Sequence, residues 1–457
     1  MEIENIIKRQ RRFFETGKTL DIGFRMAALR RLERAVRGME GQICRALKED
    51  LGKSETEGYM CEVGLVLAEL REQRRQLRRN SRARRVVSTL ANFPSRGYLV
   101  QEPYGVTLVM SPWNYPFMLA IEPLAGAIAA GNCCVVKPSA YAPATSRLIA
   151  ELLAGIFPER YVAVVEGGRE ENRALLEQRF DYIFFTGSVS VGKLVMEKAA
   201  AHLTPVSLEL GGKSPCIVDR TAKLSLAARR IVFGKLLNCG QTCVAPDYVL
   251  VERCVAEALV RELAYWIRRM YGEDALANPD YGRIVNRKHF DRIRGLMDEG
   301  KVIYGGRSRE KTLQIEPTLL YPVSGEDAVM REEIFGPVLP VLVVDSMEEA
   351  RRFVRKRPRP LACYVFTRSS RTKRMFVRET SFGGGCVNDT VMHLTVPGLP
   401  FGGVGESGMG AYHGKAGFKT FSHEKSILEK SVRLDITARY QPFTGWKRLL
   451  IRLIGQR

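Results

Sequence analysis

The sequence has 457 residues, which is enough for two or three domains at ~150 residues each. Hydrophobic residues make up 45% and charged residues 26%, so extensive disorder, a collagen-like chain and a small disulfide scaffold are excluded. Lys and Arg number 71 against 50 Asp and Glu, which gives a formal charge of +21. This charge favours anionic partners, namely nucleic acid, acidic lipid or a phosphorylated ligand, without choosing among them.

The cysteines and the start of the chain indicate the compartment. Ten cysteines are too few for a disulfide framework of this length, and Met1–Glu4 lacks the basic-then-apolar order of a secretory signal. We therefore expect a cytoplasmic protein with free thiols.

The first ~80 residues show helical periodicity. In the helix expected over 61–80, arginines recur at a spacing that would place six guanidinium groups on one face, if the helix persists. They are Arg71, Arg74, Arg75, Arg78, Arg79 and Arg82. Such a face is either solvated or anion-binding. It has no interleaved aromatic residues, so base stacking has little support.

From about residue 100, short apolar strands alternate with helices. We expect strands over 106–110, 133–137, 162–166 and 182–185, and helices over 144–155 and 171–177. Residues 117–136 are apolar enough to raise the question of a membrane span. However, they contain Glu122 and Pro123, so a buried helix leading into a strand is expected. A second α/β run extends from about 215 past 390, and the alternation predicts parallel, doubly wound sheets.

A glycine-containing turn follows the strand that ends at Phe185. The segment 186–194 nearly fits the phosphate loop of nucleoside triphosphatases, but Leu194 has no hydroxyl group to hold magnesium. By itself the segment is either a nucleotide-binding turn at a helix start or a structural turn.

Three further segments carry candidate chemistry. Cys239 and Cys243 lie four residues apart without enough nearby ligands for zinc, so a single nucleophilic thiol or a buried inert cysteine is expected there. Glu209 lies among apolar residues and glycines, where desolvation would raise its pKa and suit it to general-base work, unless it is simply ion-paired. Asn114 lies in a loop stiffened by two prolines and three aromatic residues, which could aim its amide at a developing oxyanion or could merely form a turn.

Taken together, these segments resemble the aldehyde dehydrogenase superfamily, especially its class 3 or fatty aldehyde branch. The resemblance runs through nearly the whole chain. Its stretches are SPWNYPF at 111–117, GNCCVVKPS at 131–139, FFTGSVSVGK at 184–193, LELGGKSPCIVD at 208–219, NCGQTCVAPDY at 238–248, EEIFGPVLP at 332–340 and PFGGVGESGMGAYHGKAGFKTFSH at 400–423.

The resemblance implies NAD(P)-dependent oxidation of aldehydes, medium- to long-chain aliphatic or aromatic, to carboxylic acids through a thiohemiacetal and a thioester. Cys243 would be the nucleophile, Asn114 an oxyanion donor and Glu209 the base that activates water. The cofactor, NAD and also NADP, would be contacted by Trp113, Lys137, Gly187, Ser188, Gly192, Glu333 and Phe335. No metal site is expected. Ala140 stands where many relatives have Glu, which removes a carboxylate that would repel a 2′-phosphate, so we expect NADP to be tolerated.

The resemblance also implies an architecture. Residues 1–84 and 104–208 would form the NAD(P)-binding domain and 209–405 the catalytic domain. Residues 85–103 and 422–432 would form a small β oligomerisation arm, and a homodimer is expected. Residues 440–457 would form a basic amphipathic tail that either docks on the protein or its dimer partner, or lies with the 71–85 region on an anionic membrane.

Other functions have less support. A relative that makes acyl-CoA would generally lack the base at Glu209, and a nucleoside triphosphatase is disfavoured by Leu194. A nucleic-acid-binding or membrane-surface protein rests on charge alone, and nucleic acid is not an expected partner.

Overall fold

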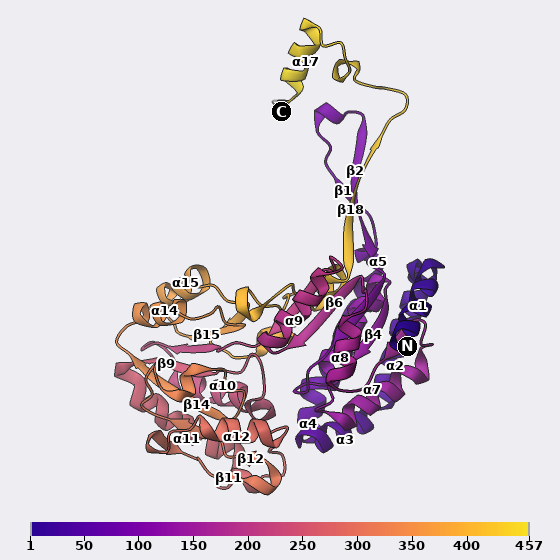
Figure 1. Ribbon diagram of the computed structural model, residues 1–457. Helices are drawn as coiled ribbons and strands as arrows, with labels where there is room; N and C mark the ends of the chain where they lie inside the picture. Colours follow the sequence, from indigo (N-terminus) through magenta and orange to yellow (C-terminus); the bar gives the residue numbers. More distant parts are fainter. Residues whose placement is uncertain (1, 456–457) are drawn as a thin grey trace.

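The computed structural model describes residues 2–455, so Met1 and the last two residues of the predicted tail lie outside the described residues. Two α/β parts lie side by side, and a narrow β arm extends away from them (Figure 1). Each of the two parts is built on a largely parallel sheet, so the predicted mixed α/β fold class is confirmed.

The first sheet has the strand order β17-β7-β6-β3-β4-β5, in which β17 alone is antiparallel to its neighbour. Its strands are β3 (Val106–Met110), β4 (Cys133–Lys137), β5 (Val162–Val164), β6 (Tyr182–Gly187), β7 (Val206–Leu210) and β17 (Gly408–Met409). Nearly every residue of β3, β4 and β6 is buried, as expected for strands covered by helices on both faces. The four predicted strands are confirmed, although β5 ends two residues earlier than expected.

Helices from both ends of the chain surround this sheet. They are α1 (Glu2–Glu15), α2 (Ile22–Gly38), α3 (Glu40–Leu51), α4 (Glu55–Gly58), α5 (Gly64–Asn80), α6 (Met118–Ala130), α7 (Pro143–Ile156), α8 (Arg169–Leu176), α9 (Val189–Ala200) and α16 (Gly414–Thr420). A π-helical turn, η2 (Tyr59–Val63), leads into α5. Every residue of α6 is buried and β4 follows it, which confirms the predicted buried helix. Gly131, with a left-handed φ of 102°, ends α6.

The predicted arginine face of α5 is shorter than the spacing suggested. The helix ends at Asn80, so Arg82 lies beyond it. Arg71 and Arg74 form ion pairs with Glu33. Part of this face is therefore neutralised within the chain.

The second sheet has the strand order β10-β13-β14-β9-β8-β15-β16, with β10 antiparallel at one edge. Its strands are β8 (Pro215–Val218), β9 (Tyr248–Glu252), β10 (Val302–Tyr304), β13 (Thr318–Leu320), β14 (Val338–Val344), β15 (Ala362–Phe366) and β16 (Gly384–Val387), with a small separate ribbon of β11 (Ser308–Arg309) and β12 (Gln314–Ile315). The helices of this part are α10 (Leu224–Leu236), α11 (Ala256–Tyr271), α12 (Arg287–Gly295), α13 (Ala328–Arg331), α14 (Met347–Arg355) and α15 (Ser370–Glu379).

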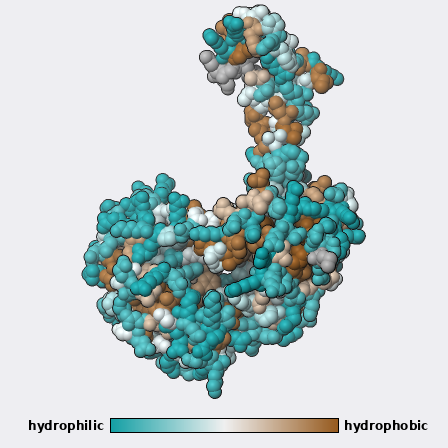
Figure 2. Space-filling view, viewed as in Figure 1, coloured by the Kyte–Doolittle hydropathy of each residue, from teal (hydrophilic) through white to brown (hydrophobic). Residues whose placement is uncertain are grey.

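The arm is an antiparallel sheet of β1 (Arg84–Val86), β2 (Ser95–Pro103) and β18 (Ser422–Lys430). Hydrophobic side chains are visible along its surface (Figure 2). The tail helix α17 (Gly445–Gly455) lies beside the far end of the arm, where it contacts η3 (Leu90–Asn92). Within residues 2–455, no helix combines the length and the apolar character needed to cross a membrane.

Candidate active site

The loop that carries Asn114 follows β3 and is held in place by a buried ion pair. The Lys53 ammonium binds the Glu62 carboxylate and also donates to the Asn114 carbonyl oxygen at 2.9 Å. Glu62 Oε2 accepts from the backbone N–H groups of Phe117 and Met118 at 2.9 and 3.1 Å, which satisfies donors at the start of α6. One ion pair thus holds the middle of the loop and its end at α6.

The loop that carries Cys243 follows α10 through a short turn, η4 (Leu237–Gly240), with left-handed backbone. Asn238, Cys239 and Gly240 have φ values of 51°, 53° and 75°. Asn and Gly tolerate this conformation readily, whereas Cys does so less often. A Cβ at Gly240 would come 2.2 Å from the Gly336 carbonyl oxygen, so only glycine fits there.

Three hydrogen bonds join these two loops. Asn238 Nδ2 donates to the Asn114 carbonyl oxygen at 2.8 Å, and the hydroxyl groups of Tyr115 and Thr242 lie 2.6 Å apart. Asn114 Nδ2 donates to the Gln241 carbonyl oxygen at 3.0 Å. An amide nitrogen carries two hydrogens, so this bond fixes the direction of the Asn114 side chain and leaves a second N–H.

Glu209 lies on β7, and both of its carboxylate oxygens are buried without a hydrogen-bond partner in the described part of the chain. Burial raises the pKa of this carboxyl group well above its usual range, as the sequence predicted. The ion-paired alternative is wrong for Glu209 in this structure, because no ion pair to it exists among residues 2–455.

The three predicted catalytic residues line one cavity of about 460 Å³ between the two parts. Five of the seven predicted cofactor residues, namely Trp113, Gly187, Ser188, Glu333 and Phe335, also line it. The lining residues are Pro112, Trp113, Asn114, Thr186, Gly187, Ser188, Val189, Ser190, Glu209, Leu210, Gly211, Cys243, His289, Arg292, Glu332, Glu333 and Phe335. Residues more than 200 positions apart in sequence are thereby brought together.

Lys137 and Gly192 are predicted cofactor residues that do not line this cavity. The Lys137 ammonium donates to the carbonyl oxygens of Pro138 and Gly167 at 2.8 and 2.7 Å, and burial lowers its pKa. A Cβ at Gly192 would lie 2.6 Å from the Leu210 side chain, so this glycine lets α9 pack closely on β7.

The turn at the start of α9 has the features of an anion site. Ser188 is the N-cap of the 12-residue helix, and the helix N-terminus carries partial positive charge. A Cβ at Gly187 would lie 2.5 Å from the Phe185 ring. Gly187 therefore fits beside this ring where a larger residue would collide with it.

Another part of the cavity wall is formed by Glu333, Phe335 and Trp113. Phe335, at a φ of 50°, packs edge-on against Trp113 with ring centroids 5.4 Å apart. Burial and the nearby Asp247 raise the pKa of Glu333 to about 8. A Cβ at Gly211 would come 2.2 Å from Glu333 Oε2, so the carboxylate occupies space that only a glycine leaves open.

Cys243 also lines a second cavity of about 170 Å³, on the other side of the loop. Its walls are almost entirely apolar. They are formed by Met60, Cys61, Leu65, Tyr115, Met118, Leu119, Glu122, Phe233, Leu237, Thr242, Cys243, Val244, Val391, Met392, Leu394, Thr395, Phe401, Tyr412 and His413. One thiol is therefore shared by a polar cavity and an apolar one.

The Cys243 thiol is strongly desolvated. Burial, with smaller contributions from the charges of Glu333 and Glu209, raises its pKa to about 12. The thiol is thus protonated near neutral pH, and a base must accept its proton before it attacks.

The sequence reasoning missed His289 and Arg292, which α12 brings to the cavity. Arg292 donates to the carbonyl oxygens of Glu333 and Ile334 at 3.1 and 2.6 Å and so holds the segment that carries Glu333. His289 lies 5.2 Å from Trp113, measured between ring centroids. The local sequence around them has no motif, so no signal could have identified them.

Comparison with known proteins assigns almost the whole chain to one family. Residues 1–427 match the family described as "Aldehyde dehydrogenase family". The chain belongs to the aldehyde dehydrogenase family.

Two of its relatives are rat proteins, each 46% identical to it. One is "Aldehyde dehydrogenase family 3 member A2", with 94% of this chain and 89% of the relative covered. The other is "Aldehyde dehydrogenase, dimeric NADP-preferring", with 96% and 98% covered. The predicted class 3 branch is therefore confirmed.

A solved structure of Staphylococcus aureus AldH, described as its substrate-bound state, matches with a TM-score of 0.97 and 46% identity over 99% of each chain. This aldehyde dehydrogenase is thus an aldehyde-oxidising oxidoreductase of a family that uses NAD or NADP.

Proposed function

We propose that this aldehyde dehydrogenase oxidises medium- to long-chain aliphatic or aromatic aldehydes to carboxylic acids through intermediates on Cys243. The observation that carries the proposal is the position of Cys243, which lines the polar cavity together with Asn114 and Glu209 and also lines the apolar cavity. The aldehyde would reach the sulfur from the apolar cavity, whose walls suit an alkyl chain or an aromatic ring.

In the first step, Cys243 Sγ forms a bond to the aldehyde carbon and gives up its proton. We propose that this proton passes to solvent through the polar cavity, which leaves the Glu209 carboxylate free for the later step with water. Its raised pKa makes it a stronger base than an exposed carboxylate.

The carbonyl oxygen becomes negatively charged in this step. Two N–H groups are proposed to bind it, the remaining one of Asn114 Nδ2 and the backbone N–H of Cys243. Donors fixed in advance stabilise developing charge because they need no reorganisation during the reaction. The bonds that hold the Asn114 loop to Lys53, Asn238 and Gln241 provide this fixation.

NAD or NADP bound in the polar cavity would supply the hydride acceptor, so that loss of hydride from the aldehyde carbon would leave the substrate as a thioester on Cys243. The residues proposed to hold it are Ser188 and Gly187 at the start of α9, together with Glu333, Phe335 and Trp113, all of which line the polar cavity. Lys137 and Gly192, which do not line it, are proposed as further cofactor residues. Glu209 then takes a proton from water, whose oxygen bonds to the thioester carbon. The carbon–sulfur bond breaks, the carboxylic acid leaves, and Glu209 returns the proton to Cys243 Sγ.

Each part of the fold has a proposed role. Residues 1–84 and 104–208 would bind the cofactor, 209–405 would carry the nucleophile, and the arm of 85–103 and 422–432 would join two chains in a homodimer. The arm extends well beyond the body, and a relative's name includes the word "dimeric". Sedimentation of the purified chain tests the dimer, and a monomer at micromolar concentration would exclude it.

We also propose that the tail helix α17 contacts anionic membranes. Trp446, Leu449 and Leu453 are each more than half exposed on it, and Lys447 and Arg448 lie beside them. Exposed apolar residues next to cations are typical of helices that lie in a membrane interface. Co-sedimentation with anionic vesicles at low and high salt tests this, and no binding at low salt refutes it. A cytosolic location remains a prediction.

The catalytic proposal is tested by trapping the enzyme with substrate and cofactor and measuring its intact mass and the site of the adduct. Cys243→Ala should abolish aldehyde oxidation and acyl adduct formation. Cys239→Ala is the matched control, because Cys239 lies in the same loop but lines neither cavity. An adduct at Cys239, or full activity of Cys243→Ala, would overturn the proposal.

A further inference from the structure

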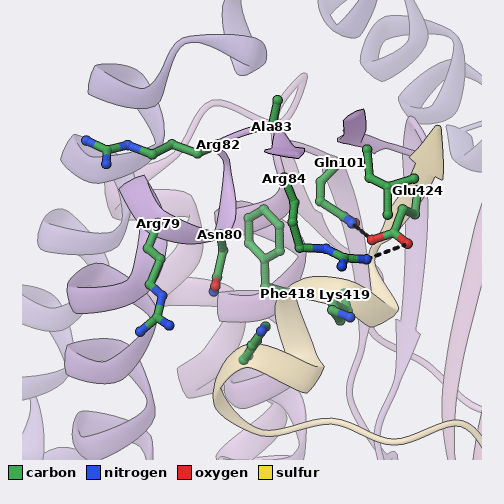
Figure 3. A pocket seen from close by; sticks show the side chains of 11 residues that line it. Arg79, Asn80, Arg82, Ala83, Arg84, Gln101, Phe418, Lys419 and Glu424 are labelled. Carbon is green, nitrogen blue, oxygen red and sulfur yellow. Dashed lines mark hydrogen bonds and ion pairs between the residues drawn. The ribbon is translucent and has the colours of Figure 1, made fainter. Parts of the chain in front are cut away.

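A third cavity lies at the base of the arm, away from both active-site cavities, and we call it the arm-base pocket (Figure 3). Its volume is about 360 Å³. Its lining residues are Arg79, Asn80, Arg82, Ala83, Arg84, Leu99, Gln101, Lys415, Phe418, Lys419 and Glu424. None of them lines the active-site cavities, so the reaction proposed above does not explain them.

The arm-base pocket carries an excess of positive charge. Its single carboxylate, Glu424, lies 3.9 Å from Arg84 and also accepts from Gln101, as the dashed lines in Figure 3 show. The other four cations are Arg79, Arg82, Lys415 and Lys419, and none of them has an ion-pair partner among residues 2–455. The negative end of the α5 dipole, about half a charge, does not balance four cations, and the two lysines come from α16.

Asn80 adds a hydrogen-bond donor to the same cavity. The residue is only 9% exposed, and its buried Nδ2 donates to no acceptor among residues 2–455. In Figure 3 its side chain lies between those of Arg79 and Phe418. An unpaired buried donor is costly, so its presence in a lined cavity indicates an acceptor that comes from outside the chain.

We propose that the arm-base pocket binds a phosphate group that carries two or more negative charges. A phosphate supplies several acceptor oxygens for the Asn80 amide, and the Arg79 guanidinium can bind it through two parallel bonds. The lysines Lys415 and Lys419 supply further charge from α16, and the buried Phe418 ring of the same helix gives the lining an apolar part. The phosphate belongs either to a phosphorylated small molecule or to a phospholipid headgroup, which share this chemistry.

The probes are inorganic pyrophosphate and phosphatidylcholine vesicles that contain phosphatidate. Binding is measured by calorimetry and co-sedimentation with the full chain at saturating NAD, so that the proposed cofactor turn is occupied. The test variants are Arg79→Gln/Lys419→Gln and Asn80→Asp, of which the latter keeps the side-chain shape and replaces the donor with a carboxylate. Arg78→Gln/Arg85→Gln is the matched control, because it removes two nearby exposed charges that do not line the pocket. Circular dichroism verifies that each variant is folded.

We expect both test variants to weaken binding by at least about tenfold and the control to change it less than twofold. If pyrophosphate shows this pattern, the ligand is a free phosphate compound. If only the vesicles show it, the ligand is a lipid headgroup. Equal weakening by the control would mean diffuse attraction to a basic surface and would overturn the proposal, as would the absence of binding by both probes.

Discussion

Replacing Gly211 with alanine should damage catalysis without unfolding the enzyme. The new Cβ would lie 2.2 Å from Glu333 Oε2, whereas a carbon–oxygen contact needs roughly 3.3 Å, so the carboxylate must move by about 1 Å. Glu333 is the end of a flexible side chain and can move at little cost to stability. A displacement of about 1 Å at a positioning group can cost about 10²-fold in rate, equivalent to about 2.7 kcal/mol.

The assay compares two reactions of the same thiol. Gly211→Ala should lower kcat/KM for NAD-dependent aldehyde oxidation by about 10²-fold and raise KM for NAD. Ester hydrolysis at Cys243, which needs no cofactor, should fall much less. Gly38→Ala is the matched control, since no heavy atom lies within 4 Å of its added Cβ. If Gly211→Ala retains kcat/KM within about twofold, the position of Glu333 is not needed and the reasoning fails.

Four other predictions follow from the site. Asn114→Ala should lower kcat by roughly 10²–10³, measured by steady-state kinetics, because one oxyanion donor is lost. An unchanged kcat would remove Asn114 from the mechanism. Glu209→Gln should slow deacylation more than hydride transfer, so a first-turnover burst of NADH should persist in stopped-flow traces; loss of the burst in a folded variant contradicts this division of roles. Because burial raises the pKa of Cys243 to about 12, its alkylation by iodoacetamide in the free enzyme should speed up about tenfold per pH unit from neutral pH through the usual thiol pKa near 9. A plateau below pH 9 would show that the thiolate is stabilised. Because Ala140 provides no carboxylate, NADP should support more than about a hundredth of the kcat/KM of NAD, which limits discrimination to about 2.7 kcal/mol, and Ala140→Glu should reduce NADP use selectively.

The elements most accurately predicted from sequence are the central strands. The limits of β3 and β4 agree with the prediction because each is a short apolar run buried on both faces. The end of α5 was less predictable, since the arginine spacing continues past Asn80, where the helix stops. A periodic pattern of exposed residues sets no boundary, because no packing depends on it.

Some residues of the active site were predictable from sequence and others were not. The motifs placed Asn114, Glu209 and Cys243, and the structure brings all three to one cavity. The Lys53–Glu62 pair that supports the Asn114 loop could not be found, because its members lie far before the loop in the sequence and form no motif. Residues that support the site from distant parts of the sequence can be identified only in the folded structure.

Because the two cavities meet at one sulfur atom, the substrate specificity of this enzyme can change while its redox chemistry stays the same. Substitutions among the apolar side chains that line one cavity can reshape it for a different carbon skeleton, while the lining of the polar cavity stays unchanged. Selection can therefore act on the two halves of the catalytic centre separately.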